Sequence, residues 1–388
     1  MNNGYLCATK KEGTSVEKAD VRVKCFAASG AGVSECHAII RSCKPGTSFK
    51  EQLDSLSDAL NSLLDSMPGF TPVFERFFLS DSATQQSVVE AAFDNRHCAV
   101  SVVEQPPLDG TKVAMWVWLQ RNISCQFLGK GMFCLSHGRY TQLFSAGVTA
   151  KGLSSRVQTR EALVAYGEKL GELGCTLADN CVRTWFFVQN IDVNYKGVVY
   201  ARNEVFNAQG LTNDTHFIAS TGIGGRVADP GYFVDMDAYS VKGLAPGQMT
   251  YLYAPTHLNR TSDYGVSFER GVRVDYGDRR HVIISGTASI DNKGRVVYAG
   301  DIRLQTERML DNVAALLDEA GCNYEDTMHL IVYLRDIADY RTVTEMLEAR
   351  FPKTPYVVLL APICRPGWLV EMECMAVKSQ NDPRFPSF

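Results

Sequence analysis

The sequence predicts an α+β fold in which one ββαβαββ unit occurs three times along the chain. The first observation is a repeated helix start, where apolar residues at helical spacing follow a glutamine in each copy: Gln52, Gln158 and Gln305. The second is a short apolar strand that ends in aspartate after each helix: Asp81, Asp192 and Asp336. The third is a closing strand with the pattern Val-x-Met, at residues 113–115, 234–236 and 370–372.

Each element of the unit follows from a local pattern. In the last copy, the apolar run 281–290 and residues 295–298 flank the turn signal Asp-Asn-Lys-Gly, which predicts a hairpin before the first helix. The middle copy has the corresponding strand at 141–147. The aspartate-ended strand is followed by a second helix, as at 340–351, and each copy then closes with two strands around a glycine-containing turn.

The repeats divide the chain into units. We expect units at 20–120, 121–242 and 270–380, with residues 243–269 as a linker. Three equivalent units in one chain predict a monomer with internal pseudo-threefold symmetry and a cleft at each junction between neighbouring units.

Composition and charge exclude several classes of protein. The chain of 388 residues is 45% hydrophobic and 21% charged, as expected for a globular protein. The net charge of -4, with no basic domain, argues against a nucleic-acid partner. No apolar run reaches the ~20 residues that span a bilayer, and residues 1–10 lack the apolar core of a secretory signal. We therefore expect a cytoplasmic protein without membrane contact.

The chain has twelve cysteines. No pair has the spacing C-x-x-C, and no histidine lies at zinc-finger distance from a cysteine, so no metal site is expected. Most cysteines, such as Cys175 and Cys322, lie in apolar surroundings. This pattern predicts free, buried thiols in a reducing cytosol.

The closing strands differ at one position, which holds Ala114, Asp235 and Glu371 in the three copies. The fold therefore does not need an acid there, and a buried strand position favours an apolar residue. Either the two acids are exposed strand carboxylates, or they have a chemical task. A glutamic acid whose pKa is raised by burial can donate a proton.

Arginine and glycine residues near these strands suggest a binding cleft. Arg365 and Arg226 precede the closing strands, either as surface ion pairs or as planar binding groups for a carboxylate ligand. Ser285 and Gly286 end an apolar strand, where glycine indicates a β-bulge or close approach of a ligand. Thr221 and Gly222 begin a glycine-rich turn that lacks the spacing of a phosphate loop; we expect this turn to line a cleft.

The last copy resembles the Rid (reactive intermediate deaminase, YjgF-like) family. The resemblance rests on residues 285–291 and 300–306, on Arg365 and on the ending Val-Glu-Met-Glu. Rid proteins are homotrimers with ligand clefts between subunits, so the resemblance implies three fused Rid/YjgF-like (chorismate-mutase-like) units that form a pseudo-trimer. It also implies that Arg365 binds a substrate carboxylate. The family's Asn and Tyr on the second helix are replaced by Thr344 and Leu347, which argues against simple imine deamination.

A longer stretch, residues 120–378, is similar to the chorismatase family. The matching segments are residues 219–224, 284–290, 299–301 and 363–373. Chorismatases cleave the enolpyruvyl ether of chorismate to pyruvate and a hydroxybenzoate or a dihydroxycyclohexadiene carboxylate. The resemblance implies that Glu371 is the catalytic acid. It also implies that Cys364, seven residues earlier, favours 3-hydroxybenzoate as the product.

The chemistry of this reaction agrees with the residues. Cleavage of an enol ether begins with protonation of its methylene carbon, which requires a neutral, positioned carboxylic acid. The two carboxylates of chorismate require cationic groups, for which Arg365, Arg202 and Arg226 are the candidates. Arg202 falls where the Rid helix faces its cleft, although a solvated helix arginine is the alternative. No cofactor is needed. The other hypotheses are a Rid-like enamine or imine deaminase and a non-catalytic small-molecule binding protein.

Overall fold

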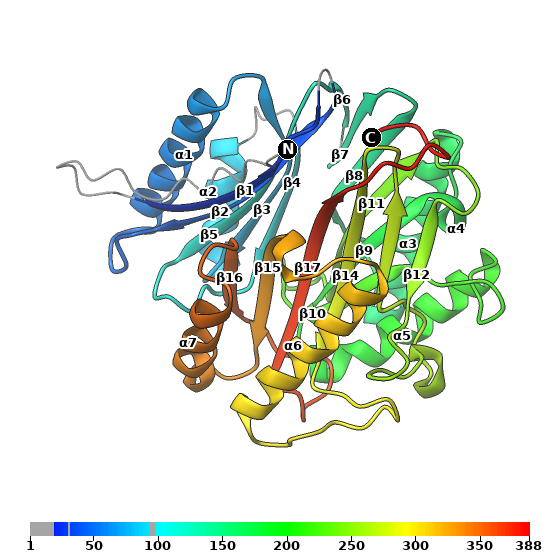
Figure 1. The fold of residues 1–388 in the computed structure, drawn as a ribbon. Coiled ribbons are helices and arrows are strands. Elements are labelled where there is room, and N and C mark those ends of the chain that lie inside the picture. Colours follow the sequence, from blue (N-terminus) through cyan, green and yellow to red (C-terminus); the bar gives the residue numbers. More distant parts are fainter. Residues whose placement is uncertain (1–18, 30–31, 94–97, 130) are drawn as a thin grey trace.

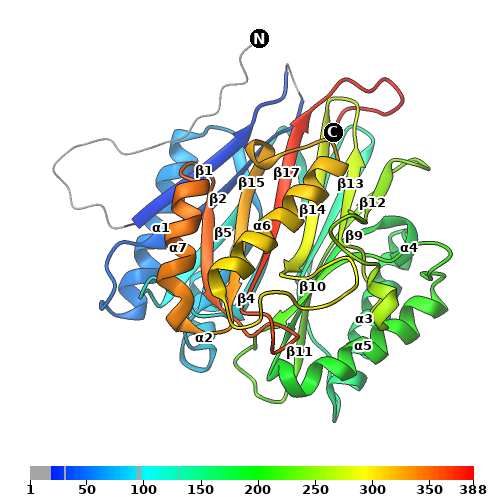
Figure 2. The same ribbon diagram turned by 60° about the horizontal axis from the view of Figure 1, so that its bottom comes forward.

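The computed structural model describes residues 19–29, 32–93, 98–129 and 131–388. It contains three mixed β-sheets in chain order, with five, six and six strands. Each sheet carries its helices on its outer side, and the three sheets face a shared interior (Figure 1, Figure 2). These findings confirm the α+β class and the three repeated units.

The first sheet has the order β1-β2-β5-β3-β4. Its elements are β1 (Ala19–Phe26), β2 (Ser34–Ser42), α1 (Phe49–Ser66), β3 (Phe70–Leu79), α2 (Ser82–Phe93), β4 (Ala99–Glu104) and β5 (Val113–Arg121).

The second sheet has the order β10-β9-β11-β8-β7-β6. Its elements are β6 (Ser124–Gly129), β7 (Met132–His137), β8 (Tyr140–Val148), α3 (Ser155–Glu172), α4 (Leu177–Asn180), β9 (Cys181–Val188), α5 (Ile191–Ala208), β10 (Ala219–Gly224) and β11 (Val234–Lys242).

The third sheet has the order β12-β13-β14-β17-β15-β16. Its elements are β12 (Met249–Leu252), β13 (Gly271–Asp275), β14 (Arg279–Ala288), α6 (Ile302–Glu319), β15 (Thr327–Leu334), α7 (Tyr340–Arg350), β16 (Tyr356–Leu360) and β17 (Val370–Ser379). Short 3-10 helices lie at Thr261–Tyr264, Tyr324–Asp326 and Ile337–Asp339.

The closing strands β5, β11 and β17 lie inside their sheets, each antiparallel to two neighbours. The helix glutamines explain part of the repeat, because each side chain accepts a hydrogen bond from the backbone amide that enters the closing strand. The pairs are Gln52 with Lys112 (2.8 Å), Gln158 with Phe233 (2.7 Å) and Gln305 with Leu369 (2.9 Å). One buried amide per unit thus ties the helix start to the central strand.

The units also join through backbone pairs at their junctions. The first and second units meet at Glu104 and Arg226, where the Glu104 amide donates to the Arg226 carbonyl (2.8 Å). The second and third units meet at Ile223 and Ile363. A continuous apolar core crosses these junctions and includes aromatic side chains from different units, such as Trp118 beside Tyr239.

Two expectations about the third unit were wrong. The hairpin partner of β14 is β13, which precedes it, whereas residues 295–298 form only an isolated bridge between Val296 and Ile290. The turn signal at 291–294 therefore joins β14 to a short return segment. The expected linker 243–269 contains β12, which adds an edge strand to the third sheet.

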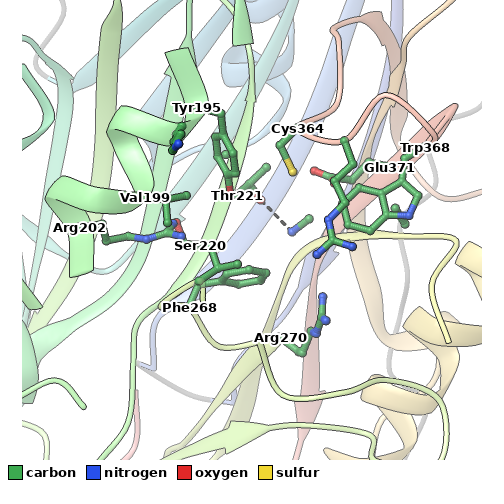
Figure 3. A pocket seen from close by; sticks show the side chains of 16 residues that line it. Tyr195, Val199, Arg202, Ser220, Thr221, Phe268, Arg270, Cys364, Trp368 and Glu371 are labelled. Carbon is green, nitrogen blue, oxygen red and sulfur yellow. Dashed lines mark hydrogen bonds between the residues drawn. The ribbon is translucent and has the colours of Figure 1, made fainter. Parts of the chain in front are cut away.

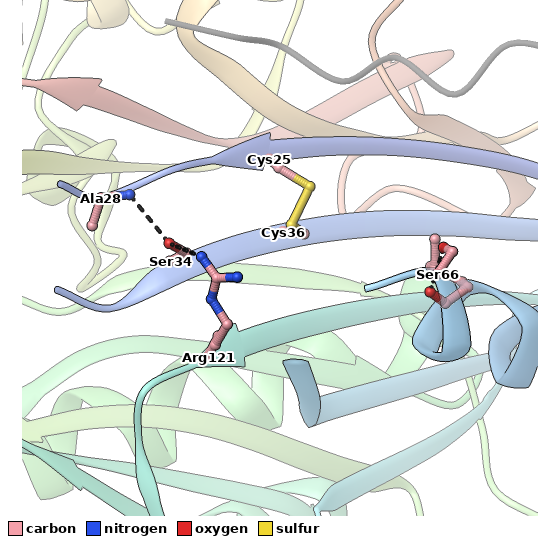
Figure 4. The surroundings of a disulfide bond; sticks show 7 residues. Cys25, Ala28, Ser34, Cys36, Ser66 and Arg121 are labelled. Atoms are coloured by element: carbon pink, nitrogen blue, oxygen red, sulfur yellow. Dashed lines mark hydrogen bonds between the residues drawn. A yellow bond between two sulfur atoms is a disulfide. The ribbon is translucent and has the colours of Figure 1, made fainter. Parts of the chain in front are cut away.

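The cysteine prediction was also wrong in part. Cys25 and Cys36 lie directly opposite each other on β1 and β2 and form a disulfide (Figure 4). Cys43 and Cys125 are exposed thiols, whereas Cys175 and Cys322 are buried as expected. Because disulfides are typical of oxidising compartments, the cysteines do not support a cytosolic location. Cys7 and residues 1–10 lie outside the described residues.

Within the described part of the chain, no helix is both long and apolar enough to cross a membrane.

Candidate active site

A cleft of about 240 Å³ lies at the junction of the second and third units. The second unit contributes side chains of α5 and β10, and the third unit contributes β14, β17 and the loop before β17 (Figure 3). Glu371, Arg365, Cys364, Arg202, Thr221, Gly222 and Gly286 all line it. The structure therefore brings together seven of the nine residues that the sequence singled out for the site.

Glu371 is the central acid of this cleft. It lies on β17 opposite Tyr333 of β15 and is only 4% exposed, so it is not an exposed strand carboxylate. Burial, and then the negative charge of Glu373, raises the pKa of the Glu371 carboxyl to about 8. The side chain is thus mostly protonated at neutral pH and can donate a proton.

Glu373, two residues further along β17, is held as an ion pair. Arg183 lies 2.6 Å from one carboxylate oxygen, and the Trp185 indole donates to the other (2.8 Å). The Thr221 hydroxyl also donates to Glu373 and at the same time accepts from the Gly286 amide (2.8 Å). The two acids therefore have different roles. Glu373 is a carboxylate that accepts hydrogen bonds from charged and neutral donors, and its negative charge helps to keep Glu371 protonated.

A β-bulge brings the backbone close to Glu371. The register of β14 with β17 shifts between Ile284 and Thr287, as the bulge alternative predicted. A Cβ on Gly286 would lie 2.3 Å from Oε1 of Glu371, so any larger residue at this position would displace the Glu371 carboxyl group. Ser285 does not line the cleft. It is buried behind the lining, where its hydroxyl donates to the Glu269 carbonyl (2.6 Å) and accepts from the Ser220 amide (2.9 Å).

Arg202 is the most unusual cation of the cleft. It projects from α5 and is only 1% exposed, so it is not a solvated helix arginine. Its Nε and one terminal nitrogen are buried and find no hydrogen-bond partner among the described residues. Buried donors are normally satisfied, which makes Arg202 a strong candidate to bind an anionic ligand.

Two further arginines face the same cavity. Arg365 donates to the Gly294 carbonyl (3.2 Å), and its guanidinium lies 4.8 Å from the centre of the Trp368 ring. Arg270 donates to the Asn259 carbonyl (3.3 Å). With Arg202, they make the cleft positive and suited to a ligand with more than one carboxylate.

Arg226 is not part of this cleft, contrary to our expectation. It is exposed and pairs with Glu104 of the first unit, with 2.8 Å between Nε and the carboxylate oxygen. The reason lies in the repeat, because the loop before each closing strand faces the preceding unit. The loop before β17 therefore faces the second unit, whereas the loop before β11 faces the first.

Cys364 is a half-buried residue beside Glu371. Burial, followed by the negative charge of Glu371, raises the pKa of Cys364 to about 12, so the thiol stays neutral. Tyr195 of α5 approaches Cys364 from the second unit, and a Cβ on Gly222 would lie 2.7 Å from the Tyr195 ring. Gly222 thus makes room for Tyr195 within the cleft.

The sequence analysis did not identify Tyr195, Phe268, Arg270 and Trp368 as site residues, yet all four line the cleft. Phe268 lies in the expected linker, and Arg270 begins the third unit, so neither belonged to a recognised element. Trp368 falls within the matching segment 363–373, but tryptophan at this position has no obvious chemical task. The signal that could have found Arg270 was the pairing of a cation with an aromatic residue two positions earlier.

Comparisons with known proteins agree with this architecture. The family model described as Endoribonuclease L-PSP matches residues 268–378. A RutC family protein of Pyrococcus abyssi is 30% identical over 99 residues, covering 25% of this chain and 78% of the relative. The 3-aminoacrylate deaminase RutC of Acinetobacter baylyi is 30% identical over 98 residues, covering 24% of this chain and 77% of the relative.

A solved structure matches a larger part of the chain. A chorismatase crystal structure shares the fold with a TM-score of 0.62 and 20% identity, covering 79% of this chain and 93% of the other. Fold and site together define a Rid-fold protein with a chorismatase-like arrangement of units. By its sequence relatives, the chain belongs to the RutC family.

Proposed function

We propose that the protein is a chorismatase-like enzyme that cleaves the enolpyruvyl ether of chorismate. The observation that carries the proposal is a protonated acid, Glu371, in the same cleft as Arg202, two of whose guanidinium nitrogens have no hydrogen-bond partner among the described residues. The acid supplies the proton that an enol ether requires, and the arginines supply partners for the two carboxylates of the substrate.

In the proposed reaction, Glu371 transfers its proton to the methylene carbon of the enolpyruvyl group. The ether carbon becomes an oxocarbenium ion, and the newly formed Glu371 carboxylate stabilises this positive charge. For a hydroxybenzoate, the C–O bond to the ring then breaks, pyruvate leaves with the ether oxygen, and the ring becomes aromatic by losing a proton, which returns to the Glu371 carboxylate. For the dihydroxycyclohexadiene carboxylate, water adds to the oxocarbenium carbon and the bond from this carbon to the ether oxygen breaks. One proton of the water then goes to the ring oxygen and the other returns to Glu371. Release of a hydroxybenzoate with pyruvate adds no atoms to chorismate, whereas release of the dihydroxycyclohexadiene carboxylate consumes one water. Cys364 supports 3-hydroxybenzoate as the favoured product.

The test is incubation of the purified protein with chorismate, with pyruvate measured by coupling to lactate dehydrogenase and the ring product identified by chromatography. Glu371→Gln preserves shape and removes the proton donor, so pyruvate formation is expected to fall by about 10²-fold or more. Glu168→Gln, on the exposed side of α3, is the matched control and should leave the rate unchanged. No pyruvate above the uncatalysed background at high enzyme concentration would refute the proposal.

A Rid-like enamine or imine deaminase is the second candidate. It is favoured by the match of residues 268–378 to a Rid-type family model and by the position of Arg365 in the cleft. Ammonia release from an imino acid, together with no pyruvate from chorismate, would select it. A thermal shift with chorismate but no product in either assay would select the non-catalytic binding hypothesis.

We also propose that the protein acts as a monomer, because the three units of one chain take the places of three subunits. Light scattering should then report a mass near 42.9 kDa.

A further inference from the structure

A second cleft, of about 420 Å³, lies at the junction of the first and second units. It has the same construction as the candidate active site, one unit earlier in the chain. Asp235 lines it from β11 and pairs with Phe187 of β9, just as Glu371 pairs with Tyr333 of β15. The second helix of the preceding unit forms a wall in both cases: α2 here and α5 in the candidate active site.

The glycine bulge is repeated as well. The register of β8 with β11 shifts between Met236 and Ala238, and Gly147 lies in the bulge at the position that corresponds to Gly286. The Gly147 amide donates to Asp237 (2.9 Å). Asp237 also forms an ion pair with Arg76 of the first unit, with 2.7 Å between nitrogen and oxygen. Glu373 forms the corresponding ion pair with Arg183 of the second unit. Both clefts thus have one acid that is anchored by an arginine of the preceding unit.

The fold itself does not require this arrangement. In the first unit the corresponding closing-strand residue is Ala114, and β2 pairs with β5 in continuous register from Ser34–Arg121 to Arg41–Ala114. Among the described residues, the junction of the third and first units therefore has neither an acid at this closing-strand position nor the bulge. The buried acid and the bulge occur at two junctions, while the third junction, in its described residues, folds without them. This pattern indicates a binding or chemical role for the acid, not a requirement of the fold.

Asp235 is the buried acid of the second cleft. It is 2% exposed, and neither carboxyl oxygen has a hydrogen-bond partner among the described residues. Burial and the neighbouring Asp237 raise its pKa well above the ordinary value. A buried carboxyl group without a partner, next to an open cavity, is poised to receive a donor from a ligand.

The walls of the two clefts have opposite charge. The candidate active site has three arginines, whereas none of the described residues that line the second cleft is Arg, Lys or His. Instead, Glu90 and Asp229 lie at exposed positions of its lining, and Phe93 and Val102 form apolar walls. Acidic groups beside an apolar wall favour an organic cation and disfavour a carboxylate.

We propose that this second cleft binds a small organic ammonium ion with an apolar body. The ammonium group donates to the ionised carboxylate of Asp235, which releases its proton to solvent as the cation binds, and it lies in the field of Glu90 and Asp229. The apolar body packs on Phe93 and Val102. The site is separate from the proposed chorismate cleft and does not depend on its chemistry.

The test is isothermal titration of the full-length protein with benzylamine, with benzyl alcohol and benzoate as neutral and anionic probes of similar shape. Saturable binding of benzylamine is expected, and binding of the two control probes should be weaker by about tenfold or more. Asp235→Asn should weaken benzylamine binding by about tenfold, because the amide cannot form the charged pair. Glu371→Gln should leave benzylamine binding unchanged, since Glu371 lies in the other cleft.

A second variant keeps the proposal testable if Asp235→Asn does not fold. Glu90→Gln changes an exposed residue of α2 and should weaken benzylamine binding by about twofold to threefold without changing the melting temperature. The proposal is overturned if benzylamine does not bind at millimolar concentration, if benzoate binds equally well, or if both variants bind as tightly as the native protein.

Discussion

Gly286→Ala is the sharpest test of the way in which the fold positions the acid. The added Cβ would lie 2.3 Å from Oε1 and 2.9 Å from Cδ of Glu371, while ordinary van der Waals contact begins near 3.4 Å. The carboxyl group must therefore move by 3.4 − 2.3 = 1.1 Å. A displacement of ~1 Å can cost about 10²-fold in rate, or about 2.7 kcal/mol in activation free energy.

The assay is pyruvate release from chorismate by Gly286→Ala and by the native protein, with the melting temperature measured in parallel. Gly171→Ala is the control, because a Cβ at this position of α3 meets nothing within 4 Å. The control should keep full activity and gain slightly in stability, since alanine favours a helix. If Gly286→Ala folds normally and keeps full activity, the position of the Glu371 carboxyl does not govern the reaction and the reasoning fails.

Three further predictions concern groups that the structure places in defined environments. The pKa of Glu371 is raised from 4.5 to about 8, so the rate should fall as the pH rises through 8. Between pH 4.5 and 8 the folded state holds a proton on Glu371 that the unfolded chain has lost, so the free energy of unfolding should fall as the pH rises through this range. Denaturation curves of Glu371→Gln should show a weaker pH dependence. Arg202→Met should raise KM for chorismate by about tenfold or more without lowering the melting temperature, because two guanidinium nitrogens have no partner in the described part of the protein. A lower melting temperature with unchanged KM would instead give Arg202 a structural role. Cys25→Ser should lower the free energy of unfolding by roughly 2–3 kcal/mol, because the Cys25–Cys36 disulfide closes a loop with a sequence separation of 11. Equal urea midpoints for the variant and the native protein would contradict this prediction.

Much of the fold could be predicted because its signals are local. The glutamine at each helix start and the Val-x-Met of each closing strand recur, and the structure shows that they are joined by the same hydrogen bond in every unit. Strand partners were harder to predict. The apolar run at 281–290 showed a strand, but its neighbour was assigned to residues 295–298, because a turn signal indicates a bend and not which segment pairs.

The sequence by itself determined the three copies, the acid on two closing strands and the motif that holds Cys364, Arg365 and Glu371 within eight positions. Only the tertiary structure decided which acid meets which cations. Arg226 and Arg365 precede equivalent strands, yet they face different junctions, because each unit contacts a different predecessor. Burial of Glu371 and the separate clefts of opposite charge arise between units, from residues distant in sequence, and no local pattern carries that information.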